Sequence, residues 1–199
     1  MIDLCSGLGG ASEAFVQAGW TVIRIETNPD LQYIPFTVNL DVLLWEEWLP
    51  DLLQEADLVW ASPPCLEFSN AYGAPGPTAG RVGADYEPDL SILEACRAII
   101  GYLNPTWWVI ENVQGAVMWF PPDMGEYRQA IGPFYLWGKF PRIVMPYSFH
   151  HRKQDHDTWS SNPMRANIKA KIPFEVSFAL LETLVRQWTL DRWGGPDGC

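Results

Sequence analysis

The segment Ile2-Asp3-Leu4-Cys5-Ser6-Gly7-Leu8-Gly9-Gly10 joins a short apolar strand, expected over residues 1–5, to a helix expected over residues 10–18. Glycines at 7, 9 and 10 let the backbone approach a ligand closely, and the start of the helix offers free N–H donors. Such a turn occurs in many nucleotide-binding folds, so alone it is weak evidence. Glu26 strengthens it, because an acid ending the next strand can accept both hydroxyls of a ribose. The alternative for Glu26 is an ordinary solvated strand end.

Strands and helices alternate outward from this segment. Alternation of this kind predicts an α/β fold with a mostly parallel sheet and helices on both of its faces. Residues 70–88 carry Gly, Pro, Ala and Asn without periodicity and are expected to form a long loop, and residues 194–198 a flexible tail. The further strands are expected at Thr21–Glu26, Asp57–Ala61, Trp107–Ile110, Phe134–Trp137 and Ile143–Val144, and the further helices at Leu43–Glu55, Leu90–Leu103 and Val176–Trp188.

Length and composition favour one globular unit. The chain has 199 residues, of which 48% are apolar and 19% charged, and no break in composition divides it, so we expect a single domain over residues 1–199. No apolar stretch is long enough to span a membrane and no leader opens the chain, so a cytoplasmic protein without a membrane partner is expected. The four Cys form no Cys-x-x-Cys pair and lie away from the His residues, so we expect no metal and no disulfide. A monomer is the expected state.

The charges are segregated along the chain. The net charge of −11 argues against general affinity for nucleic acid. Residues 139–171 nevertheless hold seven Lys and Arg against two Asp, and all three His. This segment, which includes Arg152 and Lys153, could present a positive face to a phosphate backbone. A chance fluctuation of surface charge is the alternative.

A second segment with chemical potential is Ala61-Ser62-Pro63-Pro64-Cys65-Leu66-Glu67-Phe68-Ser69. Two prolines stiffen the chain immediately before a cysteine at the carboxyl edge of the sheet, where α/β proteins bind ligands. Cys65 is therefore a candidate nucleophile. A free cysteine can also simply be buried, as we expect for Cys96 on its helix.

A third segment, Val109-Ile110-Glu111-Asn112-Val113, ends another buried strand, and its Glu follows Cys65 by 46 residues. A carboxylic acid at this edge could donate to, or protonate, a ring nitrogen. Glu111 could alternatively cap a helix or be a solvated charge.

In this order, the three segments resemble the DNA cytosine-5 methyltransferase family, which shows a Phe-x-Gly-x-Gly turn, a Pro-Cys nucleophile and a Glu-Asn-Val triplet. The similarity covers about residues 2–113 and returns more weakly at 165–185, around Arg165 and Lys171-Ile172-Pro173. That late segment would pack beside the first strand and complete the cofactor pocket. The resemblance implies a Rossmann-like fold that binds S-adenosylmethionine and releases S-adenosylhomocysteine.

The resemblance also implies roles for individual residues. The turn would lie along the methionine part of the cofactor, Glu26 would hold the ribose, and Asp41 would lie near the adenine amino group, unless it caps a helix instead. The implied cofactor-binding residues are Leu4, Cys5, Ser6, Gly7, Leu8, Gly9, Gly10, Glu26, Thr27, Asn28, Asp41, Val42 and Pro63.

The implied chemistry starts with the Cys65 thiolate, which would add to C6 of a cytosine taken out of duplex DNA. Glu111 would bind or protonate N3, and Asn112 would position Pro64 and its loop. Residues 70–88 would act as a mobile lid. The implied substrate-binding residues are Pro64, Phe68, Ser69, Arg81, Val113, Arg152 and Lys153.

The chain departs from the family pattern in three places. Cys5 replaces an aromatic residue, and Thr27-Asn28 replaces a bulky residue that often stacks on adenine. The family's Gln-x-Arg-x-Arg segment is not legible; the strand over 134–137 takes its place, with Arg128 the nearest upstream cation. Only about residues 138–164 stand where a recognition domain is usual, which implies a short recognition sequence.

Compact forms of this kind resemble those of bacteriophages, which implies the cytoplasm of a bacterium or of a phage-infected cell. Two alternatives stay open. One is a cytosine-5 methyltransferase acting on RNA or on a free nucleotide, and the other is a non-catalytic subunit that pairs with an active methyltransferase.

Overall fold

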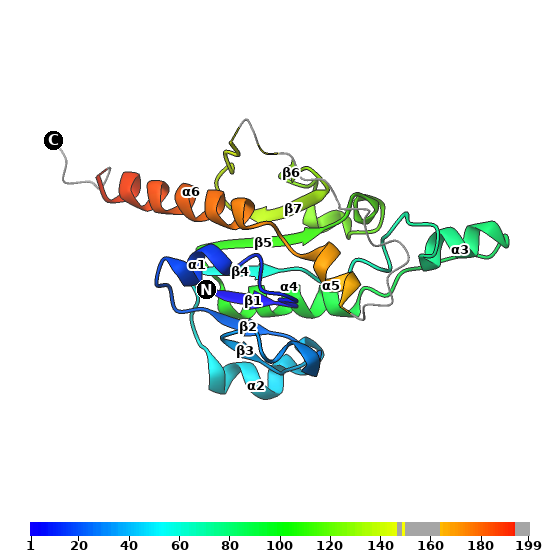
Figure 1. The fold of residues 1–199 in the computed structure, drawn as a ribbon, viewed down its shortest axis with the longest axis horizontal. Helices are drawn as coiled ribbons and strands as arrows, with labels where there is room; N and C mark the ends of the chain where they lie inside the picture. The colour runs from blue at the N-terminus through cyan, green and yellow to red at the C-terminus, as the bar shows by residue number, and fades with distance from the viewer. Residues whose placement is uncertain (147–148, 150–163, 194–199) are drawn as a thin grey trace.

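A computed structural model describes residues 1–146, 149 and 164–193 of the chain. Their strands form one seven-stranded sheet in the order β3-β2-β1-β4-β5-β7-β6 (Figure 1). All neighbouring strands pair in parallel except β7, which is antiparallel to both β5 and β6. The strands are β1 (Ile2–Leu4), β2 (Ile23–Ile25), β3 (Thr37–Val38), β4 (Leu58–Ala61), β5 (Trp107–Asn112), β6 (Gln129–Ile131) and β7 (Phe134–Lys139).

Helices cover both faces of the sheet, as the alternation of elements predicts. The α-helices are α1 (Glu13–Gln17), α2 (Trp45–Leu52), α3 (Pro75–Arg81), α4 (Ser91–Leu103), α5 (Arg165–Ala170) and α6 (Phe174–Trp193). Short 3-10 segments are η1 (Pro29–Leu31), η2 (Val42–Leu44), η3 (Gln114–Met118) and η4 (Pro122–Met124).

The alternation of side chains along β4 shows how the two cores form. Leu58 and Trp60 point to the face covered by α1 and α6, whereas Val59 and Ala61 point to the face covered by α2 and α4. All four side chains are fully buried. A strand buried on both faces reads as a continuous apolar run, which is what residues 58–61 show.

The strand order determines where a ligand can bind. From β1 the chain runs outward through β2 to β3, and from β4 it runs outward on the other side. The carboxyl ends of β1 and β4 therefore lie at a topological switch point, where open α/β sheets bind their ligands. Pairing of Leu4 with both Ile25 and Ala61 brings the turn after β1 beside Glu26 and Ser62.

Two predicted elements are wrong. Residues 70–88 are not wholly irregular, because they contain α3, which projects from the body of the molecule and buries none of its side chains (Figure 1). Ile143–Val144 is not a strand. The side-chain amide of Gln129 bonds the N–H and the C=O of Ile143, at 2.9 and 2.8 Å, in the place that a neighbouring strand would take.

No helix within residues 1–146 and 164–193 is long and apolar enough to cross a membrane.

Candidate active site

A cavity of about 470 Å³ lies at the carboxyl edge of the sheet, at the switch point. Its size is within the range of about 300–1,000 Å³ that is usual for small-molecule sites. Two other hollows, one beside Met1 and Asp57 and one beside Tyr86 and Trp119, border neither Cys65 nor Glu111. The predicted residues that line the cavity are Cys5, Ser6, Gly7, Leu8, Gly10, Glu26, Thr27, Asp41, Val42, Pro63, Pro64, Cys65, Glu111 and Val113.

Glu26 is fixed by the backbone around it. Its Oε2 accepts a hydrogen bond from the Gly7 N–H at 2.8 Å, and its Oε1 accepts one from the Asn28 N–H at 2.9 Å. Gly7 has a φ of +52°, a left-handed conformation that suits glycine and turns its N–H toward the carboxylate. Each carboxylate oxygen retains a further acceptor site for a ligand. Glu26 is therefore a half-buried, oriented acceptor and not a solvated strand end.

Ser6 is a polar residue in the wall next to this carboxylate. It is 9% exposed, and its Oγ has no hydrogen-bond partner among the described residues. A buried hydroxyl without a partner is costly unless a ligand or water satisfies it. The wall of the cavity therefore has an unused hydrogen-bonding group.

Asp41 fulfils one of the two expectations that the sequence left open. It caps η2, because its Oδ1 accepts from the Leu43 N–H at 2.9 Å, and it also lines the cavity. The capping interpretation is confirmed, and contact with adenine stays a prediction.

Three residues expected to bind a cofactor, Leu4, Gly9 and Asn28, are not among the residues that line the cavity. Leu4 is fully buried in β1, and Asn28 caps η1 through its side chain. Gly9 packs against the guanidinium group of Arg24: a Cβ atom at Gly9 would lie 2.6 Å from the Arg24 Cζ.

Cys65 and Glu111 line the same cavity from neighbouring strands. The pairing of Ala61 with Ile110 sets the segments that follow β4 next to the end of β5. Asn112, which is fully buried, donates from Nδ2 to the Pro63 carbonyl at 3.0 Å. The expected partner was Pro64; the contact is instead with the carbonyl of the peptide bond that joins the two prolines. Asn112 thus holds the stiff segment that carries Cys65.

Cys5 is the other cysteine in the wall, and it is poorly suited to attack. A hydrogen bond with Cys96 and burial hold the pKa of the Cys5 thiol well above its ordinary value. The thiolate is the nucleophilic form of cysteine, so Cys5 stays protonated. Cys96 is fully buried on α4, as predicted.

The predicted substrate-binding residues are only partly brought together. Pro64 and Val113 line the cavity. Phe68 belongs to the core, where its ring packs edge-on against Phe120, so the prediction for this residue is wrong. Ser69 Oγ accepts from the Ala71 N–H within a turn, and Arg81 lies on α3 with its guanidinium 3.9 Å from the Tyr72 ring. Arg152 and Lys153 lie outside the described residues.

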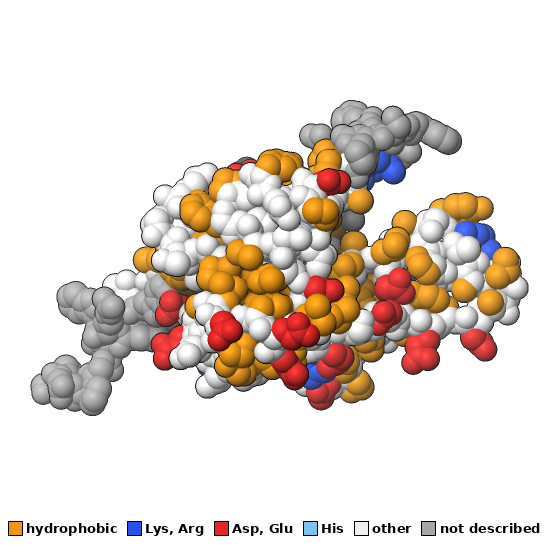
Figure 2. Space-filling model, turned by 90° about the horizontal axis from the view of Figure 1, so that it is seen from below, with side chains coloured by type: hydrophobic (Ala, Val, Ile, Leu, Met, Phe, Trp, Pro, Cys, Tyr) orange, Lys and Arg blue, Asp and Glu red, His pale blue; other side chains and the backbone are white. Residues whose placement is uncertain are grey.

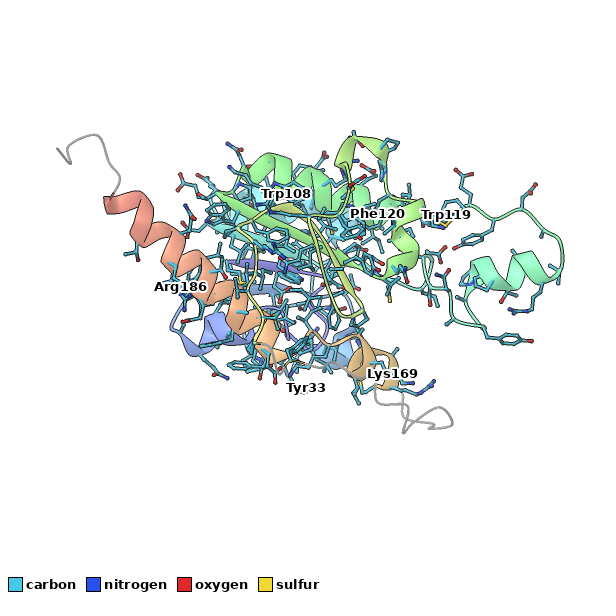
Figure 3. The ribbon with its side chains drawn as sticks, turned by 90° about the horizontal axis from the view of Figure 1, so that it is seen from above. Tyr33, Trp108, Trp119, Phe120, Lys169 and Arg186 are labelled. Atoms are coloured by element: carbon cyan, nitrogen blue, oxygen red, sulfur yellow. The ribbon has the colours of Figure 1, made fainter. Side chains whose placement is uncertain are left out.

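The late segment completes the cavity. Its motif is recognisable in the sequence, but none of its residues is among the cofactor-binding residues that the resemblance implies. Helix α5 and the residues after it form one wall. A Cβ atom at Gly10 would lie 2.2 Å from the Ile172 carbonyl oxygen, so glycine is required at position 10 for this approach. Lys171 also forms an ion pair with Glu13, Nζ to Oε2, at 2.8 Å. On α5 itself, Lys169 projects away from the sheet (Figure 3).

A buried polar group beneath the turn has no signal in the sequence. Asp3 is fully buried in β1, and its Oδ2 accepts from Ser12 Oγ at 2.6 Å. Loss of solvation raises the pKa of Asp3 to about 7, against the effects of the Ser12 hydrogen bond and of Arg24, which lower it.

No group of three or more His, Cys, Asp or Glu residues within the described part of the chain is placed to hold a metal ion. Acidic side chains outnumber basic ones on the face that Figure 2 shows, in keeping with the net charge of −11.

A family model that covers more than half of the chain identifies its family. The model of the C-5 cytosine-specific DNA methylase family matches residues 1–119. A protein of Frog virus 3 (isolate Goorha), named "Probable DNA (cytosine-5)-methyltransferase", is 34% identical over 154 residues, covering 74% of this chain and 62% of the viral protein. A solved structure described as a "putative DNA modification methyltransferase" encoded within a prophage of E. coli is 21% identical with a TM-score of 0.41, covering 62% of this chain and 34% of that one. The chain therefore spans about three fifths of its curated relative.

Proposed function

Because the chain belongs to the C-5 cytosine-specific DNA methylase family, we propose that it transfers a methyl group from S-adenosylmethionine to carbon 5 of cytosine in DNA. Cys65 is the covalent nucleophile of this proposal. One observation carries it: a single cavity joins a cysteine behind two prolines, a carboxyl group on the next strand, and a glycine-rich turn with its oriented acid.

The cavity fits the cofactor in size and in donor chemistry. Glu26, oriented by two backbone N–H groups, is suited to accept the two ribose hydroxyls. The unpartnered Ser6 hydroxyl and the turn over residues 7–10 are suited to the polar methionine end. Asp41 and Val42 would border the adenine. When bound, the cofactor supplies the methyl group.

Cys65 would start the reaction by adding its thiolate to C6 of the base. Carbon 5 of cytosine is a poor nucleophile until this bond forms, which saturates C6 and leaves C4 and C5 as an enamine-like unit with C5 as its nucleophilic carbon. The two prolines and the Asn112–Pro63 hydrogen bond hold the thiol-bearing segment in place, so little motion of this segment accompanies attack.

Glu111 would supply a hydrogen bond or a proton at N3 as negative charge moves into the ring. It is 9% exposed, at the end of β5 where its strand neighbour is Leu136. After methylation a base removes the proton from C5, and the C6–S bond breaks, which restores the aromatic ring and the Cys65 thiolate.

The cytosine must leave the stacked duplex to reach both Cys65 and Glu111. The segment 70–88 carries α3 outward from the body, as Figure 1 shows. The basic segment 139–171 would contact the phosphates. Of its cations, Lys139, Arg142, Arg165, Lys169 and Lys171 are in the described residues.

The test is incubation with methyl-labelled S-adenosylmethionine and unmethylated duplex DNA, in parallel with transfer RNA and deoxycytidine monophosphate, and mass spectrometry of the product bases. We expect 5-methylcytosine in DNA and none after Cys65→Ala, with cofactor binding retained in that variant. Label in RNA or in the nucleotide alone would overturn the DNA assignment.

A second measurement addresses the covalent step. Duplex DNA with 5-fluorocytosine should trap a protein–DNA adduct, because fluorine at C5 cannot leave as a proton does. The adduct should map to the peptide that contains Cys65. An adduct on the Cys5 peptide, or turnover without any adduct, would exclude the proposed nucleophile.

A further inference from the structure

We propose that Arg24 is a positioning residue for the cofactor: its guanidinium holds the Gly9 carbonyl and thereby sets the shape of the turn that binds S-adenosylmethionine. The inference rests on the proposed function, because it concerns the same cavity.

The guanidinium of Arg24 joins three separate segments. It donates from Nε to Ser12 Oγ at 2.8 Å, from Nη1 to the Pro35 carbonyl at 2.8 Å, and from Nη2 to the Gly9 carbonyl at 3.0 Å. Arg24 is 4% exposed, so these bonds compete little with water. The planar fork of arginine can satisfy three acceptors in fixed directions, which a lysine ammonium on a flexible stem cannot reproduce.

The absence of a side chain at position 9 is explained by this contact. Gly9 has a φ of +70°, and a Cβ atom there would lie 2.6 Å from both Cζ and Nε of Arg24. The guanidinium thus fills the space that a side chain would need. Glycine at 9 serves the packing of Arg24, whereas Gly10 serves the approach of Ile172.

The contact reaches the cavity through the residues on either side of Gly9. Leu8 and Gly10 both line the cavity. The Gly9 N–H donates to the Ser6 carbonyl at 2.8 Å, which closes the turn around Ser6 and its unpartnered hydroxyl. Fixing the Gly9 carbonyl therefore fixes the peptide planes that face the ligand.

The charge of Arg24 is compensated indirectly. Burial lowers the pKa of Arg24, and the carboxylates of Asp3 and Glu13 raise it. Ser12 connects the two buried groups, since its hydroxyl accepts from Arg24 and donates to Asp3. A buried charge is costly, and an apolar side chain would fill this space at a lower cost. The geometry of the Arg24 hydrogen bonds therefore indicates a role in placing backbone groups.

The first experiment measures S-adenosylmethionine binding by calorimetry in Arg24→Lys and Arg24→Gln, with Arg97→Gln as a matched control. Arg97, on α4, instead bonds the carboxylates of Glu94 and Asp123 and is not among the residues that line the cavity. We expect the Kd to rise at least tenfold in both Arg24 variants and to stay unchanged in the control. If Arg24 is only structural, the variants will melt at lower temperature while the folded fraction keeps the wild-type Kd. That result would overturn the inference.

The second experiment is a double-mutant cycle with Gly9→Ala and Arg24→Ala. In the wild-type background the new Cβ must displace the guanidinium, so binding weakens. In the Arg24→Ala background this clash is gone, and Gly9→Ala should raise the Kd by a clearly smaller factor. Equal factors in the two backgrounds would refute the proposal. Wild-type protein that binds no S-adenosylmethionine would remove the proposed function and this inference together, whereas normal wild-type binding with unaffected variants removes the inference alone.

Discussion

Asp3 is a carboxyl group enclosed beneath the glycine-rich turn, and its ionisation connects the fold to pH. Its pKa of about 7 lies well above the ordinary 3.8 because burial disfavours the charged form. Between about pH 4 and pH 7, the folded chain therefore keeps a proton that the unfolded chain has released. The free energy of unfolding contributed by Asp3 falls as the pH rises through this window and is constant above it.

Asp3→Asn should flatten this dependence, because the amide can still accept the Ser12 hydrogen bond but does not titrate. Urea unfolding of the two proteins at intervals from pH 4.5 to 8 measures the difference in slope. Asp89→Asn is the control, since Asp89 is exposed and a hydrogen bond from Ser91 lowers its pKa, so that it stays ionised over this range and its replacement should leave the slope unchanged. Parallel curves for wild type and Asp3→Asn would contradict the assignment.

Site residues that belong to local sequence motifs were predictable from the sequence, whereas contacts that depend on strand pairing were not. Cys65, Glu111 and Glu26 each follow an apolar strand, so their meeting at one edge follows from a parallel sheet. The contact between Arg24 and Gly9 requires β2 beside β1 and a left-handed turn, neither of which is visible in residue type. Because this contact is not visible in the sequence, Gly9 is expected there to face the ligand and not Arg24.

Tyr86 fastens the projecting segment 70–88 to the site. Its hydroxyl lies 2.7 Å from Glu67 Oε2 and 2.8 Å from the Glu67 carbonyl, and its ring packs edge-on against Trp119. Gly76 at the start of α3 leaves room for this ring. Loss of solvation and the bond to Glu67 raise the pKa of Tyr86 to about 12, so the hydroxyl keeps its proton and remains a donor.

Tyr86→Phe should release the segment while leaving the core intact. We expect limited proteolysis to cut within residues 70–88 several times faster than in wild type, with a small change in melting temperature. Tyr33→Phe, which alters a tyrosine that is 70% exposed, should leave the cleavage rate unchanged. An unaltered rate in Tyr86→Phe would show that α3 is held by other contacts.

The predictable elements are those with a strong apolar pattern. Helix α4 was expected over Leu90–Leu103 and forms over Ser91–Leu103, because its apolar residues recur on one face. Helix α3 escaped prediction, since Pro, Gly and Thr are poor helix formers and its residues make no apolar stripe. The strand predicted at 143–144 does not form, because the side chain of Gln129 bonds the backbone of Ile143 in place of a partner strand.

Ser177 ties the two ends of the described fold together. From α6 it donates to the Ala11 carbonyl at 2.7 Å and accepts from the Ala14 N–H at 3.1 Å, in full burial. Ser177→Ala should lower the free energy of unfolding by about 1–3 kcal/mol, because two buried backbone groups lose their partner. It should also weaken cofactor binding, since the Ala11 carbonyl that Ser177 holds follows directly on Gly10.

Thr183→Ala is the matched control on the same helix, because the Thr183 hydroxyl bonds only within α6, to the Ala179 carbonyl. Denaturant unfolding and calorimetry compare the two variants. A loss no larger for Ser177→Ala than for Thr183→Ala would show that apolar packing alone joins α6 to α1.

The fold class of the whole molecule was predictable from the sequence, but the order of the strands in the sheet was not. Repeated strand–helix units indicate a parallel sheet, because such connections cross over its faces. The order of the strands depends on contacts between distant segments, and the position of β7 between β5 and β6 has no local signature.

The meeting of Gly10 with Ile172 also has a consequence for synthesis on the ribosome. The glycine-rich turn is synthesised well before the wall that faces it, since Ile172 follows Gly10 by 162 residues. A nascent chain can pair β1, β2 and β4 as they appear, yet it cannot close the cavity until α5 and Ser177 have left the exit tunnel. A polypeptide interrupted before that point would carry the glycine-rich turn, Cys65 and Glu111 and still lack the wall that faces them.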